Sequence, residues 1–134
     1  MKNVAFYRRF MDLRPEFEEL EIPHLIGILA SIITGIVHLY YFPRIGLSPL
    51  GIGFIVAGLG FFAGAAAVIY GYRRKEVYLL GIPFTAGQII LWYYLNRPSL
   101  ELFLSGKPIL DFVDKVSQTV LLIVLVYLYF EGDR

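Results

Sequence analysis

The stretch that decides the fold is Pro49–Tyr72, PLGIGFIVAGLGFFAGAAAVIYGY, which contains no acidic or basic residue. A helix needs ~20 apolar residues to cross a hydrocarbon core that is ~30 Å thick. Helices of water-soluble proteins bury one stripe and keep their other faces polar, whereas this stretch is apolar on nearly every face. The sequence therefore predicts a membrane-spanning helix over this range.

Three further apolar stretches of similar length follow the same pattern, namely Ile22–Phe42, Val77–Leu95 and Phe112–Phe130. Their abundance agrees with a hydrophobic content of 57%. The connections Pro43–Ser48 and Gly71–Glu76 are short, so the spans that they join must be antiparallel neighbours. We expect an all-α fold, an integral membrane antiparallel four-helix bundle formed by residues 22–134.

The composition excludes several classes of function. A chain of 134 residues with four spans has no room for a separate soluble domain. A net charge of +1 does not indicate a nucleic-acid-binding protein. The absence of cysteine excludes disulfides, thiol catalysis and thiolate metal sites.

Residues 1–21 precede the first span and carry apolar residues every three or four positions. We interpret them as an amphipathic segment on the cytoplasmic membrane surface, bent at Pro15. The alternative is that the segment only covers one end of the bundle. The apolar residues are Phe6, Phe10, Leu13, Phe17 and Leu20.

The distribution of basic residues predicts the orientation of the bundle. Four basic residues lie before the first span, and Arg73, Arg74 and Lys75 lie in the second connection. Cytoplasmic loops are enriched in lysine and arginine. We therefore expect a multi-pass protein of the cell membrane with both termini in the cytoplasm.

Small residues recur along the first two spans at helical spacing. Such residues let helix backbones approach closely in a membrane, so we expect span two to pack closely on a neighbour, with span one the first choice. The expected packing residues are Gly53, Ala57, Gly60, Gly64 and Ala67 in span two and Gly27 and Gly35 in span one.

Polar residues inside the spans are the candidates for chemistry, because polar groups at membrane depth are costly and usually face the protein interior. In the predicted orientation they converge in the outer half of the bundle, where they would form a ligand-binding pocket. The alternative is that they only join helices or meet solvent near the span ends. The candidates are His38, Gln88, Trp92, Asn96, Asp114, Lys115 and Gln118.

Haem binding is one interpretation of His24 and His38, which are 14 residues apart and so share one helix face. Each iron would need a second axial ligand, and no other span contains a histidine. We therefore expect no metal and no cofactor, and we expect His24 to be an exposed residue at the start of a helix.

The run Gly81–Pro98, GIPFTAGQIILWYYLNRP, resembles a stretch of small archaeal four-span membrane proteins of unknown function. The Tyr72–Arg74 turn and the Val113–Val116 helix start resemble the same group, and the likeness covers residues 25–130. It implies a fold but no activity. A weaker resemblance, through Thr34–His38, is to DoxX-type four-span proteins, some of which work beside membrane redox enzymes.

The small size and the lack of a soluble domain favour a non-enzymatic role. The first hypothesis is an interaction protein, either an accessory or assembly subunit of a membrane complex or a homo-oligomer. The alternative is a redox-linked, lipid- or quinone-binding membrane protein that uses the polar pocket in the outer half of the bundle. The third is a small transporter or channel acting as an oligomer, against which the apolar inner halves of the spans argue.

Overall fold

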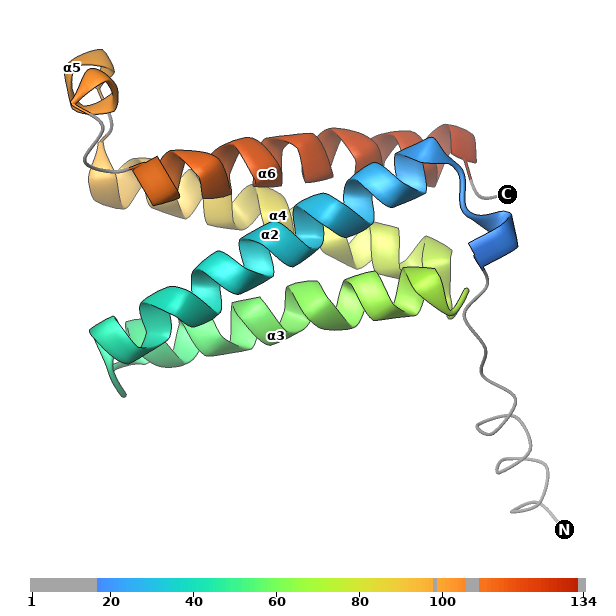
Figure 1. The fold of residues 1–134 in the computed structure, drawn as a ribbon, viewed down its shortest axis with the longest axis horizontal. Coiled ribbons are helices and arrows are strands. Elements are labelled where there is room, and N and C mark those ends of the chain that lie inside the picture. Colours follow the sequence, from blue (N-terminus) through green and yellow to red (C-terminus); the bar gives the residue numbers. More distant parts are fainter. Residues whose placement is uncertain (1–16, 98, 106–108, 133–134) are drawn as a thin grey trace, which may run out of the picture.

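The computed structural model describes residues 17–97, 99–105 and 109–132, and all regular secondary structure within these ranges is helical (Figure 1). The predicted segment at residues 1–21 lies mostly outside the described residues. The elements are the 3₁₀ turn η1 (Phe17–Glu19), the helices α2 (Ile22–Ile45), α3 (Pro49–Ile69), α4 (Arg74–Asn96), α5 (Leu100–Leu104) and α6 (Ile109–Tyr127), and the π-helical turn η2 (Leu128–Gly132).

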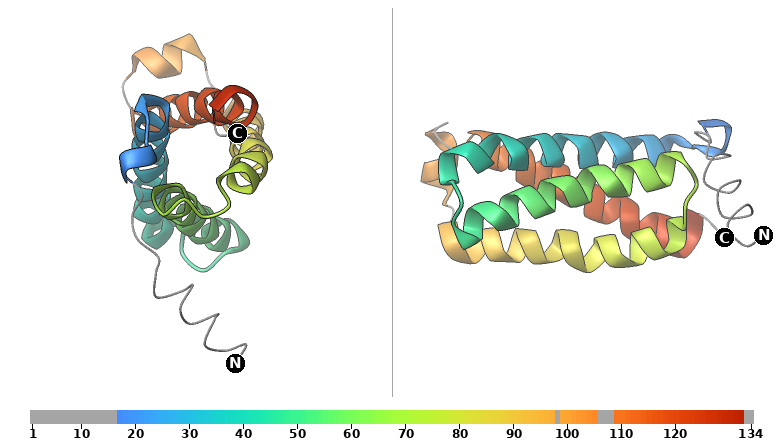
Figure 2. Two further views of the ribbon diagram at one scale, coloured as in Figure 1. Left: turned by 90° about the vertical axis from the view of Figure 1, so that its right-hand side faces the viewer. Right: turned by 90° about the horizontal axis from the view of Figure 1, so that it is seen from below.

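The four long helices run antiparallel to their chain neighbours and surround a common axis in the order α3, α2, α6, α4 (Figure 2). Helix α2 packs along both α3 and α6, and α4 packs along α6. Helices α3 and α4 touch each other much less, which leaves a loosely closed seam between them.

The two ends of the bundle differ (Figure 1). Helix α2 starts and α6 finishes at one end, together with the α3–α4 connection, and we call it the terminal end. The opposite end holds the α2–α3 connection and the short helix α5, and we call it the α5 end. This alternation follows from the short connections, as the sequence predicts.

Helix ends depart from the predicted spans for local reasons. Helix α2 passes Pro43 and ends at Ile45, because Gly46 adopts a φ of 79° and its N–H donates to the carbonyl of Phe42 at 2.9 Å.

His24, at the start of α2, is only 2% exposed, which corrects the expectation of an exposed residue. Its Nδ1 accepts a hydrogen bond from the backbone N–H of Glu21 at 2.9 Å and so closes the helix start.

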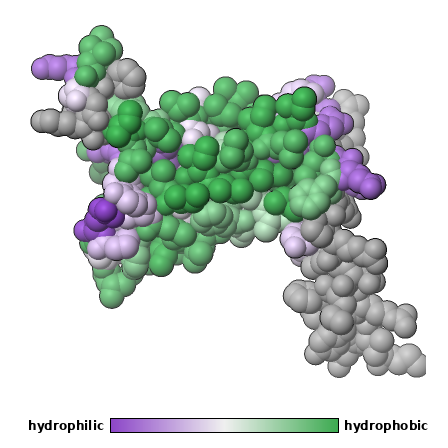
Figure 3. Space-filling view, viewed as in Figure 1, coloured by the Kyte–Doolittle hydropathy of each residue, from purple (hydrophilic) through white to green (hydrophobic). Residues whose placement is uncertain are grey.

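Three of the four long helices, α2, α3 and α4, are long and apolar enough to cross a membrane. Helix α6 does not meet that standard, because Asp111, Asp114 and Lys115 fall in its first two turns. The prediction of four spans is therefore supported for three. Figure 3 shows the surface of one face, which is hydrophobic along the middle and hydrophilic toward both ends.

Close approach of α2 and α3 depends on glycine. A Cβ added to Gly58 would lie 3.2 Å from the carbonyl oxygen of Gly35, and one added to Gly35 would lie 3.0 Å from the ring of Phe62. The buried hydroxyl of Ser31 also donates across this interface, to the carbonyl of Phe61 at 2.7 Å. The backbones therefore meet directly, as small residues permit.

The predicted small-residue stripe of α3 lies largely on the side of the helix that faces α4. Ala57 is buried in the bundle. A Cβ added to Gly60 would lie 3.2 Å from Phe84 of α4, and one added to Gly64 would meet Val77 of α4 at 4.0 Å. Gly53 has no heavy atom within 4 Å of an added Cβ, and Gly27 faces Val124 of α6. The stripe thus lines the seam between α3 and α4.

Candidate functional site

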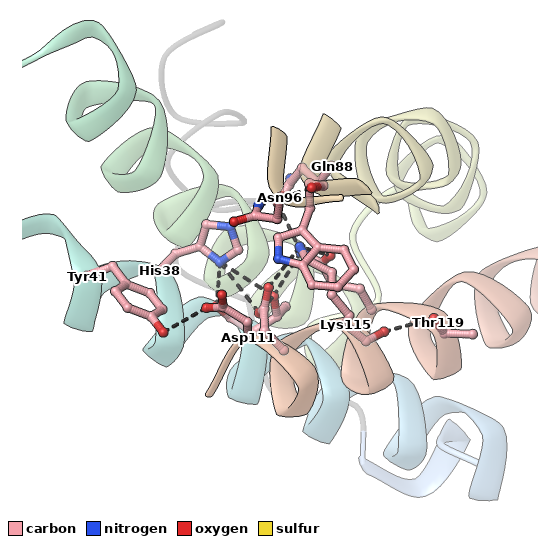
Figure 4. A network of polar contacts seen from close by, with 11 residues as sticks. His38, Tyr41, Gln88, Asn96, Asp111, Lys115 and Thr119 are labelled. Atoms are coloured by element: carbon pink, nitrogen blue, oxygen red, sulfur yellow. Dashed lines mark hydrogen bonds and ion pairs between the residues drawn. The ribbon is translucent and has the colours of Figure 1, made fainter. Parts of the chain in front are cut away.

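Polar side chains from three helices meet near the α5 end of the bundle (Figure 4). Residues three or four positions apart lie on the same face of a helix. That spacing holds on every contributing helix, so each presents several side chains to the same place. The residues are Thr34, His38 and Tyr41 from α2, Gln88, Trp92 and Asn96 from α4, and Asp111, Asp114, Lys115 and Gln118 from α6.

Asp114 is the centre of the network and is only 4% exposed. Its Oδ1 accepts a hydrogen bond from the hydroxyl of Thr34, and its Oδ2 lies 3.0 Å from Nζ of Lys115. Nδ1 of His38 lies 3.7 Å from Oδ1. A buried carboxylate is tolerated only when it is paired and hydrogen-bonded, and these contacts supply both conditions.

Gln118 connects this centre to α4. Its Oε1 accepts from Nζ of Lys115 at 2.7 Å, and its Nε2 donates to Oγ1 of Thr34 at 3.1 Å and to Oε1 of Gln88 at 3.0 Å. An ammonium group can only donate, so it fixes which end of the Gln118 amide faces it. The amide of Gln88 must then present its oxygen to Gln118 and keep its nitrogen on the other side.

Two donors of α4 are left without an acceptor by this arrangement. Nε2 of Gln88 and Nε1 of Trp92 are buried and make no hydrogen bond within the described part of the chain. Leaving a buried donor unpaired costs about 1–3 kcal/mol, and an unpaired group in a native structure calls for an explanation. A bound molecule with acceptor oxygens would satisfy both.

His38 offers a third polar atom. Its Nδ1 lies 2.8 Å from the carbonyl oxygen of Thr34, and because a carbonyl can only accept, Nδ1 carries the proton. Nε2 is the remaining ring nitrogen, and it makes no hydrogen bond with the residues that the structure describes. The ring itself packs against Phe54 and Phe61, with centroids 5.0 Å and 5.6 Å away.

These groups border a cavity of about 530 Å³ that we call the polar cavity. All four long helices contribute to its wall, and Gln88, Trp92 and Asn96 form the α4 side. A second cavity of about 580 Å³, the apolar cavity, follows it toward the terminal end and is lined mostly by hydrophobic residues of the same helices. The rings of Phe61 and Phe84, with centroids 5.1 Å apart, both line the apolar cavity.

All the predicted site residues except Gln118 line the polar cavity, and Gln118 lies behind them as their hydrogen-bond partner. Sequence reasoning missed Tyr41 and Asp111, which also line the cavity and are joined by a hydrogen bond of 2.7 Å. The available signal was their spacing, because each lies three residues from a predicted site residue on its own helix.

In the described ranges no group of three or more histidine, aspartate or glutamate side chains is arranged to hold a metal ion.

No curated protein and no solved structure matches the sequence. One family model does match, that of the family of unknown function DUF7475, over residues 15–129. The match includes all four long helices and supports the expected likeness to a family of unknown function. This chain therefore belongs to the DUF7475 family.

Proposed function

We propose that this protein is a multi-pass membrane protein that binds a membrane amphiphile, a lipid or a quinone, with its head group in the polar cavity. The four long helices cross the bilayer in this proposal, α6 included. Asp114 turns its charge into the bundle, and Lys115 is paired with it. The exposed hydrophobic side of α6 carries Val113, Val116, Val120, Ile123 and Val126, which suits contact with lipid.

The orientation follows from the basic turn at Arg73–Lys75, which lies at the terminal end and is expected to face the cytoplasm. The polar cavity then lies in the outer half of the membrane. Because the chain has no native cysteine, labelling of a single introduced cysteine shows on which side of the membrane that position lies. We expect Arg73→Cys to react with a membrane-impermeant maleimide only from the cytoplasmic side and Leu47→Cys only from the other. Labelling of both from one side would contradict the orientation.

The observation that carries the binding function is the pair of buried, unpartnered donors at Gln88 and Trp92 on the wall of the polar cavity. Polar groups at membrane depth are retained when they serve a function or find a partner. A cavity with apolar walls and a few converging polar groups is the usual form of a small-molecule site. The seam between α3 and α4 gives an amphiphile a route from the bilayer.

The test compares two neighbouring aromatic residues of α4. Trp92→Phe removes the unpartnered indole N–H, whereas Tyr93→Phe removes a hydroxyl from a side chain that is 60% exposed. Native mass spectrometry of each variant, extracted gently from its own membranes, reports the fraction that carries a small-molecule adduct. We expect Trp92→Phe to lower the affinity about tenfold, since one hydrogen bond is worth about 1 kcal/mol or more. Equal adduct occupancy in the two variants would contradict the proposal.

The interaction role is a second candidate, favoured by the small residues on the seam. Gly53, Gly60, Gly64 and Ala67 line the two cavities and would also let a helix of another chain approach. The same spectra separate the candidates, because a co-purified foreign chain or a multiple of 15.3 kDa would favour a subunit role. A channel is disfavoured by the predominantly hydrophobic lining of the apolar cavity.

A further inference from the structure

The two cavities are linked by one face of α4. Trp92 and Gln88 line the polar cavity, and Thr85, three residues from Gln88, lines the apolar cavity. Oγ1 of Thr85 is buried and makes no hydrogen bond with the described residues, like the donors of Gln88 and Trp92. Three unpartnered donors therefore follow one helix face over ~10 Å. The two cavities therefore follow one another along this face of α4.

The charges around the polar cavity disfavour an anionic head group. Two carboxylates, Asp111 and Asp114, line it against one ammonium group, that of Lys115. Lys115 is already engaged by Asp114 and Gln118. A phosphate would therefore meet net negative charge without a free cation in the wall, which is costly in a buried site. An uncharged head group with acceptor oxygens avoids this cost.

The remaining wall suits a planar ring. Phe54 and Trp92 line the cavity beside the ring of His38, and Tyr41 packs edge-on to Phe54 with centroids 6.1 Å apart. Aromatic groups prefer offset or edge-to-face contact with other rings. Positions 88 and 92 are separated by a rise of ~6 Å along α4, so we expect their donors to serve two acceptors of the same ring.

The apolar cavity offers room for one hydrocarbon chain. Its α3 wall consists mostly of glycine and alanine, among them Gly60, Gly64 and Ala67, and its α4 wall includes Leu80 and Phe84. The cavity begins where the polar groups end and follows the same seam. A chain attached to a head group in the polar cavity and extended along α4 would reach it.

Resting on the proposed function, we infer that the ligand is a quinone: an uncharged ring with two carbonyl oxygens that accept hydrogen bonds from Gln88 and Trp92. Its single hydrophobic chain lies in the apolar cavity. These groups account for binding and orientation of the ring, and His38 of α2 also lines the cavity.

Trp92 is the only tryptophan of the chain, so its fluorescence reports binding at the site. The purified protein in nanodiscs of phosphatidylcholine is titrated with decylubiquinone, and we expect saturable quenching. Phosphatidylglycerol should not compete. Gln88→Leu should weaken the affinity about tenfold, as expected for the loss of one donor. Quenching that rises linearly without saturation would overturn the inference.

A matched pair of glycine variants tests the chain-binding part. Gly64→Leu fills the apolar cavity, while Gly87→Leu adds the same side chain on α4 at a position with no heavy atom within 4 Å. We expect Gly64→Leu to weaken decylubiquinone at least tenfold and to leave the chainless duroquinone unchanged, which also shows that the variant is folded. Gly87→Leu should bind both like the wild type. Equal affinity of Gly64→Leu and Gly87→Leu for decylubiquinone would contradict the inference.

The outcomes also separate this inference from the proposed function. Tight binding of phosphatidylglycerol that is weakened by Gln88→Leu, in the absence of quinone binding, would overturn the inference of a quinone ligand. It would leave the proposed amphiphile site supported. Absence of binding by either probe, together with a native protein free of any adduct, would overturn both.

Discussion

Replacing Asp114 with alanine is expected to lower the free energy of unfolding by about 3 kcal/mol. Asp114 is 4% exposed and is the shared acceptor for Lys115 and Thr34. Removal of one partner of a buried ion pair leaves the other charge without compensation. The hydroxyl of Thr34 would lose its acceptor, and Nζ of Lys115 would keep only the neutral amide oxygen of Gln118. The measurement is reversible denaturation in micelles, followed by helical circular dichroism.

Asp111→Ala is the matched control on the same helix. Asp111 is only partly buried and accepts a hydrogen bond from the hydroxyl of Tyr41 at 2.7 Å. Its loss should cost about 1 kcal/mol. Adding Lys115→Met to Asp114→Ala should recover part of the lost stability, because the uncompensated charge is then removed. If Asp111→Ala and Asp114→Ala were equally destabilising, Asp114 would not be the centre of the network.

Gly51→Ala is expected to destabilise the fold by about 3 kcal/mol. A Cβ at this position would overlap the carbonyl oxygen of Gly46, which belongs to the backbone of the α2–α3 connection. Backbone cannot rotate away as a flexible side chain can, so the connection itself must shift. The shift would also disturb the helix start, where the N–H of Gly51 donates to Oγ of Ser48 at 3.1 Å.

Gly53→Ala makes the same substitution two residues further along α3. No heavy atom lies within 4 Å of its added Cβ. Alanine is favoured over glycine in a helix by about 1 kcal/mol, so this variant should be as stable as the wild type or more stable. Unfolding curves of the two variants, recorded side by side, test the contrast. Similar destabilisation by both variants would contradict the claim that the α2–α3 connection requires glycine at position 51.

The helices could be predicted from sequence because hydrophobicity and length decide them. The stretch around Pro49–Tyr72 becomes α3 and the stretch around Val77–Leu95 becomes α4, with boundaries shifted by a few residues. The shifts occur at turns that depend on positive φ, such as that of Gly71 at 66°, which hydropathy does not reveal. The sequence also predicts a fourth span at α6, but this helix does not meet the standard that α2, α3 and α4 meet, because it contains three charged residues, Asp111, Asp114 and Lys115.

The grouping of the site residues was also predictable, since polar residues at helical spacing on several spans have to meet somewhere inside the bundle. The neighbouring helix that each glycine of α3 faces could not be predicted from the sequence. Helix α3 carries small residues on more than one side, with Gly58 against α2 and Gly60 against α4. No polar residue in the helix marks which side faces lipid. The unpartnered donors of Gln88 and Trp92 depend on hydrogen-bond directions that only coordinates give.

The most direct test of the proposed site is the native mass of the wild-type protein extracted gently from its own membranes. We expect a 15.3 kDa monomer that carries one discrete small-molecule adduct. That adduct should decrease in Trp92→Phe and persist in Tyr93→Phe. A bare monomer, or a complex with a foreign chain and no adduct, would contradict the claim that the polar cavity is a site for a membrane amphiphile.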